Sequence, residues 1–134
     1  MICISKSNIA DFKMRIFNAD GSEAKMCGNG IRCVGKYVYD KGYTDKKFLS
    51  IETLSGVKHL TLQVIGGKVK TVTVDMGQAK AEKPMDLTVK GETVSLIPVS
   101  VCNPHAVIFV DDIETAPSQL LVLRSSIIPI FLTV

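Results

Sequence analysis

The sequence predicts an α+β domain, in which a single helix accompanies an antiparallel sheet. Segments of alternating apolar and polar residues recur along most of the chain, whereas only residues 28–41 show helical periodicity. A Gly-Gly pair between two of the strand-like segments is typical of a tight antiparallel hairpin. Because the helix is apolar over most of its surface, we expect the sheet to curl around it as a central helix.

The first predicted strand, residues 12–16, alternates apolar and charged side chains, as a half-buried strand does. A turn-rich stretch follows from Asn18 to Gly30, with Asp20-Gly21 as a turn signal. The later predicted strands are residues 48–54, 60–65, 69–76, 93–101 and 106–110. Gly66-Gly67 is predicted to join two of them, because glycine adopts positive φ without steric cost.

The predicted helix runs from about Gly28 to Lys41, and Gly42 is a suitable residue to end it. Its polar side chains form a narrow stripe of residues spaced by four, Arg32, Lys36 and Asp40. The rest of its surface is mostly apolar, and we expect Cys33 to lie in the core.

Composition argues against several classes of partner. The 134 residues carry a formal net charge of only +3, and aromatic residues make up 6% with no Trp, so nucleic acid is not an expected partner. The four cysteines and two histidines lack metal-ligand spacing, and unpaired cysteines fit a reducing cytoplasm. The start of the chain shows no secretory signal. The apolar stretch at the other end of the chain is too short, and too interrupted by other residues, for a membrane span.

Residues 18–33 carry the chemistry. They read Asn-Ala-Asp-Gly-Ser-Glu-Ala-Lys-Met-Cys-Gly-Asn-Gly-Ile-Arg-Cys, which places the Cys27 thiol at the start of the predicted helix. Unpaired backbone N–H groups and the positive end of the helix dipole favour an anion there, and they favour a thiolate for the same reason. A bound carboxylate and a basic thiolate could thus share this helix terminus.

This stretch resembles the signature of the diaminopimelate epimerase family almost residue for residue, and Asn103-Pro104-His105-Ala106-Val107 resembles a second motif of the family. The resemblance extends from about Ala10 to Glu114. It implies a diaminopimelate epimerase-like fold and an isomerase that converts LL-diaminopimelate to the meso form in lysine biosynthesis. The reaction needs no metal or cofactor, because one cysteine removes the α-proton while a second cysteine protonates the opposite face.

Carried over by position, the resemblance makes Cys27 one catalytic base. Gly28 and Asn29 match positions that hold the α-carboxylate and amino end of the amino-acid substrate, while Asn18 and Asn103 match substrate-binding asparagines. The alternative for both asparagines is turn formation. His105 is either a residue of the site wall or a packed histidine, and Glu23 is expected to stabilise the helix start.

Other interpretations remain open. Proline racemases and hydroxyproline epimerases resemble this family but carry His at the position of Asn29, so a proline racemase-like activity is the first alternative; phenazine-biosynthesis relatives lack the cysteine. A non-catalytic fragment or small-ligand binding domain is the second. Cys102 stands where the family usually has Gly, and it is not assigned as the second base.

We expect residues 1–116 to be an N-terminal epimerase domain that is incomplete at its start, and residues 117–134 to be an atypical apolar tail. The tail can be encoded by codons that, when they are read in the next frame, translate to an amino-acid sequence resembling that of the family at this point. This suggests a frameshift near Gln119, with a divergent apolar strand or interface as the alternative. The second cysteine would belong to a C-terminal domain, so the expected partners are that missing domain or a homodimer mate.

Overall fold

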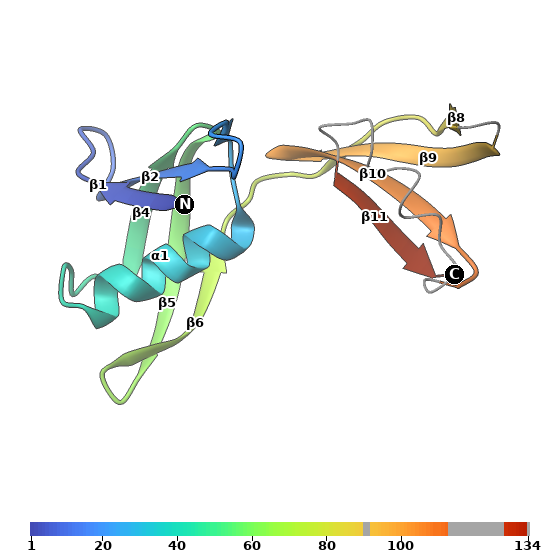
Figure 1. The fold of residues 1–134 in the computed structure, drawn as a ribbon. Coiled ribbons are helices and arrows are strands. Elements are labelled where there is room, and N and C mark those ends of the chain that lie inside the picture. Colours follow the sequence, from blue (N-terminus) through green and yellow to red (C-terminus); the bar gives the residue numbers. More distant parts are fainter. Residues whose placement is uncertain (90–91, 113–127, 134) are drawn as a thin grey trace. The chain divides into compact units, whose positions relative to one another are not determined.

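The computed structural model describes residues 1–89, 92–112 and 128–133, and the chain divides into two compact units, residues 1–76 and 77–134. Each unit is described by itself (Figure 1). The first unit contains β1 (Ile2–Ser5), β2 (Phe12–Phe17), β3 (Glu23–Ala24), α1 (Gly28–Asp40), β4 (Phe48–Thr53), β5 (Gly56–Ile65) and β6 (Lys68–Val74). The described part of the second contains β7 (Lys80–Ala81), β8 (Met85–Val89), β9 (Glu92–Val101), β10 (Asn103–Val110) and β11 (Ile128–Thr133).

The first unit is a six-stranded sheet with α1 packed against it. The strand order is β1-β2-β4-β5-β6, and β3 pairs with β2 beside this path. β5 and β6 form the predicted hairpin, and Gly66 and Gly67 between them have φ angles of 60° and 73°. The strands predicted within residues 12–76 are therefore confirmed, whereas β1 and β3, with four and two residues, are too short to show a period in the sequence.

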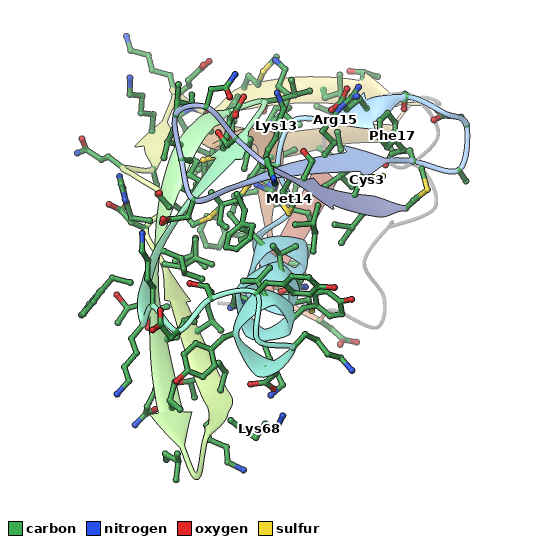
Figure 2. All side chains as sticks on the ribbon, turned by 90° about the vertical axis from the view of Figure 1, so that its left-hand side faces the viewer. Cys3, Lys13, Met14, Arg15, Phe17 and Lys68 are labelled. Carbon is green, nitrogen blue, oxygen red and sulfur yellow. The ribbon has the colours of Figure 1, made fainter. Side chains whose placement is uncertain are left out.

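Alternation along the strands separates the core of the first unit from its outer face. On β2, Met14 is only 2% exposed, whereas Lys13, Arg15 and Phe17 lie on the opposite face, with the Arg15 guanidinium 4.8 Å from the centre of the Phe17 ring (Figure 2). The other buried apolar residues of this core are Met26, Ile31, Val34, Val38, Leu49, Ile51, Leu60, Leu62 and Val69. This core holds α1 against β5 and β6.

The helix ends as the sequence predicts. Gly42 has a φ of 75°, its N–H donates to the Tyr39 carbonyl at 3.0 Å, and the Tyr43 N–H donates to the Val38 carbonyl at 2.9 Å. These two bonds form a Schellman motif, which needs positive φ at the glycine. The chain therefore leaves α1 in a fixed direction toward β4.

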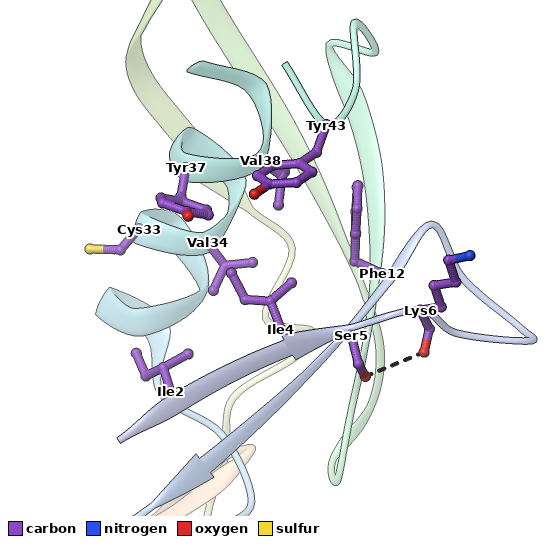
Figure 3. Close-up of a pocket in the computed structure, with 10 residues that line it drawn as sticks. All are labelled: Ile2, Ile4, Ser5, Lys6, Phe12, Cys33, Val34, Tyr37, Val38 and Tyr43. Atoms are coloured by element: carbon purple, nitrogen blue, oxygen red, sulfur yellow. Dashed lines mark hydrogen bonds between the residues drawn. The ribbon is translucent and has the colours of Figure 1, made fainter. Parts of the chain in front are cut away.

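One side of α1 faces the sheet and carries the five buried residues Gly30, Ile31, Val34, Gly35 and Val38. The polar stripe predicted at Arg32 and Lys36 is exposed. The prediction that Cys33 belongs to the core is wrong, because its side chain is exposed on the side of α1 away from β5 and β6 (Figure 3).

The second unit has a sheet in the order β11-β10-β9-β7, with β8 paired to β9. β9 and β10 form an antiparallel hairpin that turns at Cys102. Its small buried cluster contains Leu96, Ala106 and Ile108. These strands confirm the predictions at residues 93–101 and 106–110, except that β10 begins three residues earlier.

The prediction that the sheet is antiparallel is wrong at two strand pairs. β2 and β4 run parallel, with Phe12 opposite Ile51, because the chain returns between them through the α1 crossover. β10 and β11 also run parallel, with His105 opposite Ile128. Both sheets are therefore mixed, with a majority of antiparallel pairs.

The boundary predicted between residues 116 and 117 and the frameshift suggested near Gln119 lie outside the described residues, so both stay predictions. β11 lies within the stretch predicted as an atypical tail. In the described part of the chain, no helix has the length and apolar character that a membrane crossing requires.

Candidate functional site

Cys27 is the N-cap residue of α1. Its backbone is extended (φ −142°, ψ 109°), and its Sγ atom accepts a hydrogen bond from the Gly30 N–H at 3.3 Å. The Cys27 carbonyl accepts the first helical bond from the Ile31 N–H at 2.9 Å. The partly buried thiol therefore lies at the helix N-terminus, where the sequence predicted it.

The first turn of α1 presents backbone donors beside this sulfur. The helical pattern supplies no acceptor for the N–H groups of Gly28 and Asn29. No acidic side chain lies in the first turn to neutralise the positive end of the helix dipole. Two N–H groups, the dipole and a thiol are thus grouped at one helix end, an arrangement suited to an anionic group.

The Asn29 side chain is exposed and its Oδ1 atom accepts a hydrogen bond from Nη2 of Arg32, one turn further along α1. The sequence placed Arg32 only on the polar stripe of the helix and missed this contact. The signal that could have found it is the spacing of three residues, which places two side chains next to each other on a helix surface.

Asn18 lies in a tight turn between β2 and β3. Its N–H donates to the Ser22 carbonyl at 2.8 Å, and its Nδ2 donates to the Ser22 hydroxyl at 3.0 Å. The Ser22 hydroxyl and N–H donate to Asp20, at 2.6 and 2.9 Å, and these bonds lower the pKa of the Asp20 carboxyl group. Asn18 therefore has the turn role that the sequence left as the alternative, and a substrate role for it stays a prediction.

Glu23 does not stabilise the helix start as expected. It lies on β3, where both carboxylate oxygens accept from Arg15 on β2, at 2.8 and 2.7 Å. The bidentate bond to Arg15 lowers the pKa of the Glu23 carboxyl group. The expectation is wrong because Glu23 lies on β3, before α1 begins at Gly28, whereas the helix dipole acts only over the first helical turn. Glu23 forms an ion pair with Arg15 instead.

Asn103 belongs to the second unit, where it begins β10 directly after the turn at Cys102. Cys102 has a φ of 63°, the left-handed conformation that favours glycine. Further along β10, the His105 Nδ1 atom is buried without a hydrogen-bond partner among the described residues. The structure thus groups Cys27, Gly28 and Asn29 at one helix end, and places Asn18 in a turn of the first unit and Asn103 on β10 of the second.

Two pockets of the first unit lie beside α1. The larger one, with a volume of about 810 Å³, lies between β1 and α1 and is mainly apolar; Ile4 points toward Val34 in it (Figure 3). The smaller one, about 460 Å³, lies beside the helix N-terminus and is lined by Gly28, Arg32, Val72, Thr73, Val74 and Met76. The smaller pocket is the one that adjoins the candidate site, although the larger has the more apolar lining.

Within residues 1–89, 92–112 and 128–133, no three His, Cys, Asp or Glu side chains lie close enough together to hold a metal ion. Cys3, Cys27 and Cys33 are free thiols. The chemistry available at the helix terminus is therefore that of a thiol and hydrogen-bond donors.

Comparison with known proteins assigns the family. The sequence profile described as "Diaminopimelate epimerase" matches residues 1–82. A diaminopimelate epimerase of Phocaeicola vulgatus is 52% identical over 126 residues, covering 85% of this chain and 45% of its own length. One of Methanococcus maripaludis is 48% identical over 132 residues, covering 89% of this chain and 48% of its own length.

The fold comparison agrees with a racemase-type fold. A hydroxyproline epimerase of Agrobacterium vitis, solved with bound trans-4-hydroxy-L-proline, is similar with a TM-score of 0.70 at 18% identity, covering 81% of this chain and 33% of that chain. The present chain spans about half the length of the curated relatives it matches. By its sequence match over more than half of its residues, the chain belongs to the diaminopimelate epimerase family.

Proposed function

We propose that this chain forms one half of the active site of a diaminopimelate epimerase and that Cys27 is one of its two catalytic bases. The observation that carries the proposal is the position of the Cys27 Sγ atom at the N-cap of α1, 3.3 Å from the Gly30 nitrogen. This hydrogen bond and the helix dipole stabilise negative charge on sulfur, and a base must hold that charge before it takes a proton.

In the proposed reaction, the N–H groups of Gly28 and Asn29 hold the substrate α-carboxylate. The Cys27 thiolate removes the α-proton, so that the C–H bond breaks, an S–H bond forms and the electron pair moves into the carboxylate. The donors at the helix terminus stabilise this developing negative charge. Inversion then requires a proton from the opposite face, which a second cysteine outside this chain would deliver.

The remaining assignments follow from membership of the family. Asn18 and Asn103 are proposed to bind the amino-acid substrate, and the sheet is proposed to enclose α1 as a central helix once the second half is present. The reaction would need no cofactor or metal, and it would serve lysine biosynthesis in the cytoplasm. The partner that completes the site would be a C-terminal domain or a homodimer mate.

The test is hydrogen exchange at the substrate α-carbon. The purified chain is incubated with LL-diaminopimelate in D₂O, and deuterium at the α-carbon and the stereochemistry are followed by NMR and chiral chromatography. We expect exchange without inversion, because one base can remove a proton from only one face and return deuterium to it. Replacement of Cys27 by Ala should abolish this exchange.

The matched control is Cys33→Ala, which removes an exposed thiol from the same helix. It should exchange at the wild-type rate. Equal exchange by wild type and Cys27→Ala would contradict the role of Cys27, and inversion by the chain alone would contradict the need for a second half. Proline and hydroxyproline in the same assay test the alternative racemase activity.

A further inference from the structure

Arg32 has a contact for which the proposed reaction so far has no use. Its Nη2 group donates to Oδ1 of Asn29, three residues earlier on the same helix. Arg32 also lines the small pocket beside Gly28, at the end of α1 that carries the Cys27 thiol. It therefore connects a side chain of the candidate site to the wall of the adjoining pocket.

The contact with Arg32 determines which way the Asn29 amide points. An asparagine side chain has an oxygen that accepts and an NH₂ group that donates, and the two ends have nearly the same shape. A guanidinium group only donates. Since Arg32 can bond only to the oxygen end, the NH₂ end of Asn29 must point elsewhere, and the reversed amide would place two donor groups against each other.

We propose that Arg32 is a positioning residue that fixes the Asn29 amide so that its NH₂ group donates to the substrate carboxylate. The inference rests on the proposed function, in which the first turn of α1 holds that carboxylate. Arg32 acts through Asn29 and does not itself touch the substrate. Without it, the amide can rotate, and a carboxylate would meet the repelling oxygen for part of the time.

The test measures binding of LL-diaminopimelate to the purified chain by ¹H–¹⁵N NMR. The signal of the Asn29 side-chain NH₂ group is identified by its loss in Asn29→Ala. The shifts during titration of this signal and of the Gly28 backbone N–H, which every variant keeps, give the dissociation constant. Four Arg32 variants separate positioning from simple charge attraction. Ala removes the donor and the charge, Lys keeps a charged group that only donates, Gln has an amide that can both donate and accept, and Asn29→Ala/Arg32→Ala removes both partners.

We expect Arg32→Ala to weaken binding by up to about tenfold. This is less than the roughly 10- to 150-fold loss of a whole hydrogen bond to a charged ligand, because the amide still donates part of the time. Lys, which only donates, should restore most of the affinity. Gln should restore less, because its oxygen can accept from the Asn29 NH₂ group and so leaves the amide free to turn. Arg32→Ala should have no further effect when Asn29 is already Ala. Lys41→Ala, which removes an exposed cation at the other end of α1, should bind as wild type does.

The outcomes are distinct. If wild type binds but Arg32→Ala binds equally well, the positioning role is wrong and the proposed function stands. If Arg32→Ala still weakens binding in the Asn29→Ala background, Arg32 acts by charge and the inference is overturned. If wild type does not bind the substrate, the proposed function fails and the inference fails with it. Thermal unfolding of each variant shows that the fold is kept.

Discussion

Gly30 determines how much room the Cys27 thiol has. A Cβ atom at position 30 would lie 3.4 Å from Cys27 Sγ and 3.0 Å from Cδ1 of Ile2. We predict that Gly30→Ala slows alkylation of Cys27 by iodoacetamide several-fold, because the added methyl group covers one side of the sulfur. The fold should remain stable, since the Ile2 side chain is exposed and can move, and alanine favours the helix.

The measurement is alkylation of each cysteine over time by mass spectrometry, with Cys33 as an internal reference. Cys33 is exposed on α1, so its rate should not change. An unchanged ratio of the two rates in Gly30→Ala would show that the glycine does not control access to the thiol.

Cys102 is strained where it stands, because its φ of 63° brings the Cβ atom close to the backbone. We predict that Cys102→Gly raises the free energy of unfolding of the second unit by about 1 kcal/mol or less, since relief of the strain is partly offset by the greater freedom of glycine in the unfolded chain. Urea denaturation measures the change. Cys102→Ala keeps the Cβ atom, and an equal gain from Ala would contradict this explanation.

At the residue scale, the sequence predicted the features that a local motif encodes, and it missed the contacts that a residue makes with a neighbouring strand. The string Cys27-Gly28-Asn29 places a thiol at a helix start in any fold that allows the helix to form. The expected role of Glu23 was wrong because Arg15 reaches it from the neighbouring strand β2, on which Phe17 lies opposite Glu23, and the pairing of β2 and β3 is not visible in either segment alone.

At the element scale, side chains of α1 form hydrogen bonds with the backbone at the outer edge of β6, where no neighbouring strand pairs with it in the described part of the sheet. The Val69 N–H donates to Oδ1 of Asp40 at 2.9 Å, and the Val69 carbonyl accepts from Nζ of Lys36 at 2.6 Å. Lys36 also pairs with Asp40 at 2.6 Å. Because β6 ends the sheet, these bonds satisfy backbone groups that an edge strand leaves unpaired.

Gly35 allows α1 to approach the hairpin of β5 and β6. A Cβ atom there would lie 2.7 Å from Cδ2 of Leu60 and 3.3 Å from Cδ2 of Leu62, both buried. We predict that Gly35→Val lowers the free energy of unfolding by about 2–3 kcal/mol, because a packed core does not accommodate the extra volume. Urea unfolding followed by circular dichroism measures this change.

The control for Gly35→Val is Cys33→Val, which introduces the same β-branched residue at an exposed position of α1. It should cost less than about 0.5 kcal/mol. Similar losses for the two variants would mean that helix propensity, and not the close approach to β5, determines the cost.

The elements with a clear period were predicted, but the pairing of strands was predicted only for the Gly66-Gly67 hairpin. Gly66-Gly67 and the helix that ends at Gly42 follow from local backbone preferences. The parallel pair of β2 and β4 depends on where the chain returns after α1, which periodicity does not reveal. For the same reason, the exposure of Cys33 could not be deduced from an apolar helix surface, because it depends on which side of α1 the sheet covers.

On the scale of the whole molecule, carboxylates join segments that are distant along the chain of the first unit. Asp11 accepts from Lys46 at 2.6 Å and from both the N–H and the hydroxyl of Ser50 at 2.8 Å. Glu52 accepts from the Ser7 hydroxyl at 2.5 Å and from Lys13 at 2.9 Å. These bonds hold the loop between β1 and β2 against β4.

Acid should therefore loosen the first unit. The bonds to Lys46 and Ser50 lower the pKa of the Asp11 carboxyl group, and those to Ser7 and Lys13 lower the pKa of Glu52. Since both folded-state pKa values are lowered, the stabilisation is complete above roughly pH 4–5 and is lost as the pH falls through the folded-state pKa.

Urea unfolding at pH 7 and pH 3, in low salt, should show a lower free energy of unfolding at pH 3. Asp11→Asn should be less stable than wild type at pH 7 and lose less on acidification, whereas Asp86→Asn, at an exposed position of β8, should behave as wild type does. An equal loss in Asp11→Asn and wild type would assign the acid sensitivity to other groups.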